Sequence, residues 1–568
     1  MNAEKTFFKQ LVKEYMVPDR LPLIAVSTFL AGYFFGQNGV AVFTLLLPLY
    51  FLFIIAGTWI NFGAFSMAMA AVGNNETYNA QAYSNLALRT SLTAGFFLSV
   101  LALLFFPQIL EFLKVPPDLF YLAEPFGKTL AVAGILLVLS CYILQFLKVA
   151  GMQKQLKLIY KAMLIINAAV SFLCIKILNF GMEGLAVGMS AATLFCIVFE
   201  GKRLYKHFGR NLFAPISEPF SSLKKLLIAG NALAFSKIFS LSQILLFNTI
   251  CFRLYGVEGV AVFGVLQIAM RLCRIASSMT FQALTPVLLV ELGDKNIKAM
   301  MSVLKETLRR GVIFGAVIPM IILWGGADWL ATKTSLDSAW YALLIDGFHG
   351  YSVSLIFGAA NAVFIMAFLC LGHNFFSNFL AFLRSFALLL IFLWGIAADN
   401  PELLWWCFLF AEFGTFLILV AGIFLLMKTQ NYKTPLLLDK KYFRPSAYFV
   451  LAHDENSIQS ARVEIEKFIE KAASNLSVEN IQSKLQEWLK IFDENSPRKK
   501  AHLTAVHLCN DGGNFKITLR DNGKRFDYRT CAKNYSAEVG ESFSFKYALG
   551  LNNIYLTFKL EGRRTDDH

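Results

Sequence analysis

The sequence predicts a polytopic all-α membrane protein with about twelve transmembrane helices in two parallel-repeat lobes of six, followed by a small C-terminal α/β sandwich domain. Three observations predict this class. Of the 568 residues, 57% are hydrophobic and only 16% are charged, which exceeds the apolar surface a soluble protein of this size can bury. Apolar segments of about 20 residues, enough to cross roughly 30 Å of hydrocarbon, recur up to about residue 427 and then stop. Finally, "GQNGVAVF" at 36–43 returns as "GVEGVAVF" at 256–263, which indicates an internal repeat.

The apolar segments predict the individual helices. Hydrophobic patterning places them near 20–36, 39–62, 88–108, 126–148, 158–178, 184–204, 224–248, 258–288, 308–326, 340–370, 375–396 and 402–427. The basic N-terminus contains Glu4 and Glu14 and has no short apolar core before a cleavage site, so no removable signal peptide is expected. The nine cysteines are scattered without a C-x-x-C pair, so no metal site is expected either.

The distribution of charge predicts the orientation in the membrane. Cations gather at both ends of the chain and in the loops after even-numbered helices, as at Lys154, Lys202 and Arg309, whereas the opposite loops hold mostly acids. The positive-inside rule then predicts a multi-pass protein of the cytoplasmic (inner) membrane with both termini in the cytoplasm. The same rule accounts for the net charge of +14 without a nucleic-acid partner.

The repeat divides the chain. It relates the second helix to the eighth and therefore six helices to six in the same orientation, an arrangement typical of transporters whose two lobes hold substrate between them and rock. The expected parts are listed in chain order: 1–205, a first six-helix lobe; 206–222, a cytoplasmic connection; 223–430, a second lobe; 431–445, a linker; and 446–568, a cytoplasmic domain.

Residues 10–427 resemble the multidrug and toxic compound extrusion (MATE) family of the oligosaccharide and drug exporter superfamily. The resemblance depends on the 6+6 layout, the long basic connection from Lys202 to Lys225, the "GVAVF" openings of helices two and eight, and "GMEGLAVGMSAA" at 181–192. It implies a monomeric secondary active exporter of amphipathic small molecules that is coupled to H⁺ or Na⁺, works in the lipid bilayer and is not an enzyme. No cofactor is expected, and the absence of a "GxxxxGK[ST]" loop gives no indication of an ATP-driven pump.

Two alternatives stay open. A flippase for lipid-linked saccharides shares the layout of the superfamily and often uses internal arginines. A membrane sensor with a kinase-like output domain is the alternative from another class. A histidine kinase, however, needs a phosphoacceptor histidine on a dimerisation helix, and His453 lies in the loop-like stretch "LAHDENS".

Ionisable residues within the apolar segments are the candidates for substrate or ion binding, because a charge in hydrocarbon is costly and persists where it has a role. They all lie in the second lobe: Lys237 in helix seven, Arg271 and Arg274 in helix eight, Asp346 and His349 in helix ten, Arg384 in helix eleven and Glu412 in helix twelve. Arg384 and Glu412 fall at similar depth on consecutive antiparallel helices. They are therefore expected to form a buried salt bridge, the alternative being that both face water.

The charges depart from the family pattern. Many bacterial members carry a carboxylate in helix one, whereas "LPLIAVSTFLAGYFF" at 21–35 has none, and helix seven offers Lys237 where some relatives have an acid. The hypothesis is an anionic or zwitterionic substrate bound by Arg271 and Arg274, with Asp346 or Glu412 as the proton or sodium site; the alternative is structural pairing or a place at the membrane surface. The first lobe offers neutral polar groups that are expected to bond neighbouring helices: Asn61, Tyr142, Gln145 and Asn167.

The tail has a charged globular pattern. Helices are expected at 455–474 and 478–494, then strands at 501–509 and 514–520 joined by "NDGG". With "DNGKRFD" at 521–527 and "ALGLNNI" at 548–554, this order resembles the GHKL ATP-binding fold, especially the anti-sigma-factor kinase branch. The resemblance implies nucleotide contacts by Asp521, Gly523 and Gly550.

The tail also departs from its family. Where the family has a magnesium-binding Asn four residues after a Glu, Glu487 is followed by Ile491, and an apolar side chain cannot ligate a hard cation. The expectation is a degenerate domain without ATP hydrolysis or kinase activity, with ATP binding left open. Nucleotide sensing or the docking of a regulatory protein on the tail is the role this predicts.

Overall fold

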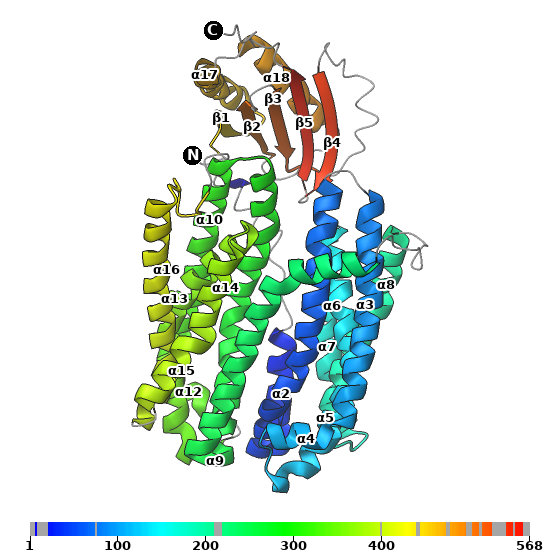
Figure 1. Ribbon diagram of the computed structural model, residues 1–568, viewed down its shortest axis with the longest axis vertical. Helices are drawn as coiled ribbons and strands as arrows, with labels where there is room; N and C mark the ends of the chain where they lie inside the picture. The colour runs from blue at the N-terminus through cyan, green and yellow to red at the C-terminus, as the bar shows by residue number, and fades with distance from the viewer. Residues whose placement is uncertain are drawn as a thin grey trace. The chain divides into compact units, whose positions relative to one another are not determined.

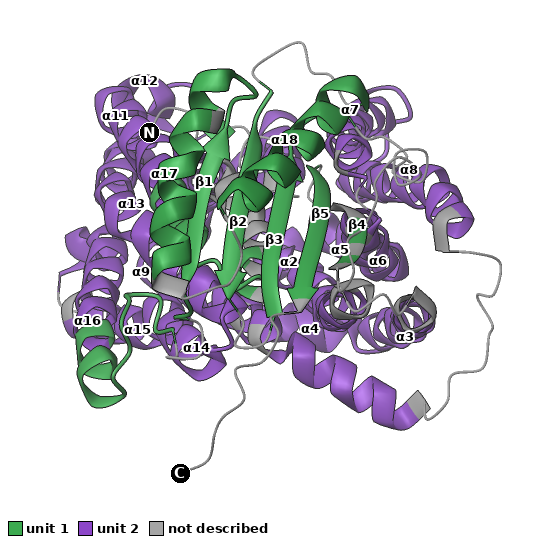
Figure 2. Cartoon of the chain, turned by 90° about the horizontal axis from the view of Figure 1, so that it is seen from above, with its two compact units in different colours: residues 1–16, 282–307, 423–568 green, residues 17–281, 308–422 purple. Residues whose placement is uncertain are grey.

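A computed structural model describes residues 6–7, 21–73, 77–150, 152–208, 219–334, 336–397, 400–438, 443–472, 478–495, 502–510, 514–524, 541–548 and 551–559. The chain divides into two compact units (Figure 2). Unit 1 combines residues 1–16, 282–307 and 423–568, and unit 2 combines residues 17–281 and 308–422. Residues 282–307, which are the end of one helix and most of the next, therefore belong to the same unit as the tail.

Unit 2 is a helical bundle. Its first half contains α2 (Leu21–Gly73), α3 (Thr77–Leu104), α4 (Phe106–Phe112), α5 (Phe120–Val132), α6 (Gly134–Val149), α7 (Gln153–Lys176) and α8 (Glu183–Phe208). The second half of the membrane part contains α9 (Pro219–Gly293), α10 (Ile297–Val312), α11 (Ile318–Gly325), α12 (Ala327–Ala331), α13 (Tyr341–Cys370), α14 (Asn374–Phe382), α15 (Leu388–Phe392) and α16 (Cys407–Thr429). Figure 1 shows the two sets as neighbouring groups of helices, blue to cyan and green to yellow.

The helix count agrees only in part with the expected twelve. Among the described residues, nine helices are long and apolar enough to cross a membrane, or ten if the bent pair 117–132 and 134–148 is one span. Two of the nine are far longer than one crossing requires, because they cover 47 residues (22–68) and 41 residues (233–273). Each of these two long helices corresponds to two of the segments that the sequence predicts.

The repeated phrase is the bend in each of these long helices. Gly36 has φ 62° and ψ −154°, and Gly256 has φ 67° and ψ −151°, a backbone conformation that residues with a Cβ rarely adopt. Three residues later, a Cβ added to Gly39 or Gly259 would lie 2.5 or 2.7 Å from a backbone oxygen of the preceding helical segment. The repeat thus preserves one tight turn between two helical segments in each lobe.

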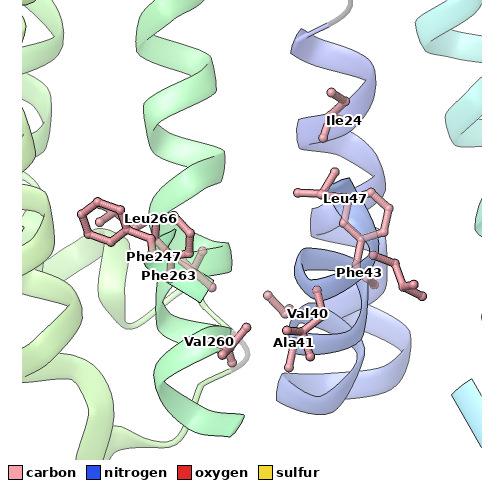
Figure 3. Packing of buried hydrophobic residues seen from close by; sticks show 14 of the residues in the cluster. Ile24, Val40, Ala41, Phe43, Leu47, Phe247, Val260, Phe263 and Leu266 are labelled. Carbon is pink, nitrogen blue, oxygen red and sulfur yellow. The ribbon is translucent and has the colours of Figure 1, made fainter. Parts of the chain in front are cut away.

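The residues after each bend form a common core. Val40, Ala41 and Phe43 of α2 and their equivalents in α9, Val260, Ala261 and Phe263, are buried in one hydrophobic cluster (Figure 3). Within that cluster the ring of Phe247 stacks on Phe408 at a centroid distance of 4.4 Å. Since lipid is as apolar as these side chains, close packing rather than removal from water stabilises such a contact in a membrane.

The tail in unit 1 is a two-layer α/β domain. Its strands are β1 (Ser446–Leu451), β2 (Thr504–Asn510), β3 (Asn514–Asp521), β4 (Glu541–Ala548) and β5 (Leu551–Lys559), and they form an antiparallel sheet in the order β1-β2-β3-β5-β4. Helices α17 (Glu455–Ala472) and α18 (Val478–Asn495) cover one face (Figure 2). Their apolar sides pack on alternate strand residues such as Val506, Ile517 and Ile554. The two helices and the β2–β3 hairpin lie where the sequence predicts them.

Candidate functional site

Arg384 and Glu412 form the predicted ion pair in the second lobe. Nε of Arg384 donates to Oε1 of Glu412 at 3.1 Å, and Nη2 donates to the same oxygen. Both side chains are largely buried, with 17% and 12% of their surface exposed. Because each charge neutralises the other, the pair is tolerated where an isolated charge is not.

Two residues of α13 complete this cluster. The Asn361 amide donates to Oε2 of Glu412 at 2.9 Å and to the Glu412 carbonyl at 2.8 Å. A Cβ added to Gly358 would lie 3.3 Å from Oε1 of Glu412 and 3.6 Å from Nη2 of Arg384, so the missing side chain leaves room for the pair. Sequence reasoning missed both residues, although Asn361 is a polar residue inside an apolar run.

Arg384 lies on a local break in its helix. Residues Leu383–Ala387 form a π-helical turn between α14 and α15, and further π-helical turns cover Ile313–Val317 and Leu393–Ala397. Such turns are rare and frequently occur at functional sites, because the extra residue changes the direction of a side chain. The break therefore sets the direction of Arg384.

The other candidates have different neighbours. Arg271 is buried and donates to Oε1 of Gln267, while Lys237 is exposed on α9. Asp346 is bonded by the Trp406 side chain, and His349 stacks on Trp324 at 4.4 Å. The side chain of Arg274 lies outside the described residues. Of these candidates, the described hydrogen bonds join Arg384 to Glu412 and Arg271 to Gln267 of its own helix.

The neutral polar residues of the first lobe join helices as predicted. Asn61 of α2 donates to Ser91 of α3 at 2.9 Å. Tyr142 of α6 shares a 2.9 Å hydrogen bond with Ser84 of α3. Asn167 of α7 donates to Ser27 of α2 at 3.0 Å. These contacts stabilise the helix bundle and leave Gln145 as the member of the set without an assigned role.

The two lobes meet at glycines. The Trp59 indole of α2 donates to the Leu227 carbonyl of α9 at 2.9 Å and to Asn231 at 3.0 Å. Beside it, a Cβ added to Gly63 would lie 1.9 Å from the Leu226 oxygen, and one added to Gly230 would lie 2.1 Å from the Trp59 oxygen. Only glycine permits so close an approach of two helices.

A second contact joins the lobes nearer the bends. Asn248 of α9 donates to the Thr44 carbonyl of α2 at 3.1 Å, and a Cβ added to Gly264 would lie 2.3 Å from Oγ1 of Thr44. Elements α2 and α9, which the repeat relates, therefore contact each other at two levels along their length.

In the tail, the carboxylate of Asp521 already forms hydrogen bonds with other residues of the protein. It is fully buried, and its carboxylate accepts from Asn552 at 3.0 Å and from the Gly523 backbone at 3.0 Å. His502 Nε2 contacts its other oxygen at 2.5 Å. Gly550, the third residue implied by the ATP-binding resemblance, lies outside the described residues. Ile491 is partly buried against the core of the tail, in keeping with its apolar character.

His502 belongs to a stacked pair. Its ring lies 4.0 Å from that of His453, and Nδ1 of both rings contacts Oδ1 of Asp493, at 2.9 and 2.7 Å. Burial lowers the pKa of His502, but the hydrogen bonds and charges of Asp521 and Asp493 outweigh it and raise the pKa above its ordinary value. Burial and the neighbouring His502 lower the pKa of His453. His502 therefore bridges the carboxylates of Asp493 and Asp521, and the opposite shifts favour a proton on His502 over one on His453.

A metal fits this cluster less well than a proton does. Ligand atoms of His453, His502 and Asp521 lie within 4.8 Å of one another, close enough in principle for a metal ion. The two rings are stacked and inclined by only 26°, however, so the lone pairs of their nitrogens lie in nearly parallel planes. Tetrahedral coordination requires ligands that converge from well-separated directions.

Sequence reasoning also missed an ion-pair cluster at Arg520, the residue before Asp521 and on the opposite face of β3. Its guanidinium donates to Glu291 and to Asp294, which lie at the turn between α9 and α10. Arg520 is 4% exposed and Glu291 is 1% exposed. Glu291 also accepts from Asn296 at 3.0 Å. A buried cation thus joins the tail to the loop of the membrane part that belongs to the same unit.

Known proteins resemble both the sequence and the fold. Residues 23–173 match the MatE family model. A structure described as the inward-facing conformation of a multidrug resistance MATE family transporter of the MOP superfamily has a TM-score of 0.64 at 16% identity, over 75% of this chain and 99% of that one. A mutant of the Vibrio cholerae MATE transporter VcmN has a TM-score of 0.65 at 15% identity, over 77% and 100%.

A third structure, from Pyrococcus furiosus, is described by the words "reverse polarity of binding pocket suggests different function of a MOP superfamily transporter". It has a TM-score of 0.63 at 16% identity, over 72% of this chain and 94% of that one. No curated protein matches the sequence. MATE proteins are transporters and not enzymes, which agrees with the expectation for this chain. The membrane part of the chain therefore has the fold of the MATE transporters of the MOP superfamily, and residues 23–173 match the family's own model.

Proposed function

We propose that the chain is a secondary active exporter that moves amphipathic small molecules out across the cytoplasmic membrane. Two lobes alternate access, and an inward gradient of H⁺ or Na⁺ drives the export. The observation that carries the proposal is the pair of equivalent bends at Gly36 and Gly256 within a MATE fold, because two lobes built alike and joined at glycine contacts are suited to rock against each other.

The substrate is proposed to carry a negative charge, alone or in a zwitterion. Glu412 is already neutralised by Arg384 and bonded by Asn361, whereas the two candidate residues on α9 whose side chains are described, Lys237 and Arg271, are positive. The first helix has no carboxylate to attract a cation. A pocket of reversed polarity is also what the description of the Pyrococcus furiosus structure reports for that protein.

Asp346 is proposed as the proton or sodium site. A carboxylate held by an arginine stays ionised and is poorly placed to exchange ions during a cycle. Asp346 is half-buried, has His349 one turn away on the same helix, and is bonded by a neutral indole. Among the described residues, its bonding partner is therefore neutral, and the carboxylate is not neutralised by an arginine as Glu412 is.

The tail is proposed to regulate the exporter and not to hydrolyse ATP. Asp521 is the residue that the ATP-binding resemblance assigns to the adenine. Its carboxylate oxygens already form hydrogen bonds with His502, Asn552 and the Gly523 backbone. Ile491 stands where a magnesium ligand is required, and Arg520 binds the turn between α9 and α10. These contacts support a role that acts through the turn between α9 and α10.

Flux measurements on the purified full chain in liposomes test this function. A panel of fluorescent anionic, zwitterionic and cationic substrates is loaded under an imposed pH or sodium gradient. The proposal expects gradient-dependent export of an anionic or zwitterionic compound. Export of cationic compounds alone would contradict the proposed substrate class while leaving the exporter function intact.

A further inference from the structure

The sheet of the tail has a polar face opposite its helices. On β2, β3 and β5, the side chains that alternate with the apolar core residues form what we name the docking face: His507, Cys509, Lys516, Thr518, Arg520, Asn553, Tyr555 and Thr557. Cross-strand pairing aligns His507 with Thr518 and Thr518 with Tyr555. Several of these polar side chains are buried, so another part of the chain must cover the face.

The turn between α9 and α10 covers it at one end. Burial lowers the pKa of Arg520 to about 10, so the guanidinium remains protonated at neutral pH and forms an ion pair with Glu291. Burial also raises the pKa of Asp294 to about 7, so its carboxylate, which Arg520 also contacts, is only partly ionised at neutral pH. A buried cation between two carboxylates fixes the turn on the docking face.

A cavity of about 220 Å³ remains between the turn and the docking face. Most of its polar lining consists of hydrogen-bond donors: Lys295 from the turn, and His507, Lys516, Thr518, Tyr555 and Thr557 from the sheet. Its carboxylate, that of Asp294, already accepts from Arg520. Lys516 is exposed, so the cavity opens to solvent at that edge. This lining favours an anion over a cation.

His507 points to an occupant. It is 4% exposed, and among the described residues its Nε2 has no hydrogen-bond partner. Buried polar atoms of native proteins are nearly always bonded, so an unbonded one that lines a cavity indicates a ligand. Burial lowers the pKa of His507 to about 4, so at neutral pH the ring is uncharged and can donate from Nε2 without a proton being taken up.

We propose that this cavity binds the phosphate or carboxylate group of a small soluble anion. The cavity is smaller than the roughly 300–1,000 Å³ of pockets for drug-sized ligands, which limits the ligand to a small metabolite. The anion would bridge Lys516 and His507 of the sheet to Lys295 of the turn and so strengthen the contact that Arg520 makes. The binding site does not depend on transport. Only the regulatory effect of the bound anion rests on the proposed function.

Equilibrium dialysis of the full chain in a non-ionic detergent against radiolabelled inorganic phosphate tests the site. The expected result is saturable binding of one phosphate per chain. Lys516→Gln should weaken binding by about tenfold or more, the usual effect of losing a charge-assisted hydrogen bond. Lys467→Gln is the matched control, because Lys467 is exposed on α17, the layer on the other face of the sheet.

Both variants replace side chains that solvent reaches, so both are expected to fold. The proposal is overturned if the wild type shows no saturable binding, which would mean that water alone fills the cavity. It is also overturned if the two variants bind phosphate equally well. The assay needs no ion gradient, so its outcome is separate from that of the flux measurements.

Discussion

Arg384 donates through two nitrogens to a single carboxylate oxygen of Glu412, and this bond joins a π-helical turn to α16. The remaining oxygen of Glu412 is bonded by Asn361, so the carboxylate is held from two helices. This arrangement gives the first prediction.

Removing one charge of the pair should do more harm than removing both. Arg384→Gln or Glu412→Gln leaves a buried charge without its partner, and such changes typically cost about 3–5 kcal/mol, whereas the double replacement leaves none. Thermal unfolding of the three variants in detergent, together with their flux, measures the effect. Equal damage from the single and double variants would show that the two charges act independently.

The bends at Gly36 and Gly256 should be destabilised by any other residue. Alanine at either position must adopt a positive φ with ψ near −150°, a region essentially restricted to glycine, which costs about 1–3 kcal/mol. Each variant is expected to lower the unfolding temperature and the flux by a similar amount, because the two bends are equivalent. Gly395→Ala is the control, since an added Cβ there meets nothing within 4 Å.

The glycine contact between the lobes should act as part of the moving interface. Gly63→Val would place side-chain atoms against the Leu226 backbone, where even a Cβ lies at 1.9 Å, and would hold α2 and α9 apart. The expected outcome is a folded protein with flux reduced about tenfold or more, because the lobes can no longer close there. Normal flux with unchanged stability would show that this contact does not form during the cycle.

The contact of Arg520 with the turn should control exposure of the docking face. Arg520→Met removes the cation but leaves Glu291 buried without it, so the turn should leave the sheet. Hydrogen exchange read by mass spectrometry is expected to accelerate in both the 291–296 and 514–521 peptides. Glu291→Gln combined with Arg520→Met should restore part of the protection, and acceleration confined to one of the two peptides would contradict a direct contact.

The stability of the tail should fall in mild acid. The pKa of His507 is about 4 in the folded protein, below its ordinary value of 6.5, so the unfolded chain binds the extra proton first. The stabilisation of the folded tail that results from this lowered pKa is complete above pH 6.5. As the pH falls toward 4, up to about 3 kcal/mol of it is lost. The lowered pKa of His453 acts in the same direction, and the raised pKa of His502 acts in the opposite one.

Replacing one histidine separates these effects. His507→Gln should flatten the acid loss of protection in the β2 and β3 peptides between pH 6.5 and 4, relative to the wild type. If the wild type is equally protected across that range, His507 does not titrate as its burial requires.

Local patterns in the sequence were sufficient for some features and not for others. The Arg384–Glu412 pair was predictable because two charges at matched depth in apolar segments have few other ways to be tolerated. The contact of Arg520 with Glu291 spans 229 residues along the chain, and nothing local to either residue indicates the other. His502 likewise reaches Asp521 only because β2 and β3 pair.

Because local sequence does not indicate distant contacts, neither the helix count nor the full sheet of the tail could be predicted. The sequence marks Gly36 and Gly256 as repeated, but the continuity of the helix on either side of each depends on its packing. The β2–β3 hairpin was predictable from its turn, whereas β1, β4 and β5 join the sheet through distant partners.

Substrate flux in liposomes under an imposed ion gradient tests the central claim most directly. Liposomes hold the wild type or the Asp346→Asn variant, with a fluorescent anionic or zwitterionic substrate on the cytoplasmic side of the protein. Alternating access coupled through Asp346 predicts uphill movement by the wild type that stops when the H⁺ and Na⁺ gradients are collapsed, and that is lost in the variant. Uphill movement by the wild type that persists with both gradients collapsed, or equal uphill movement by both proteins, would contradict this account.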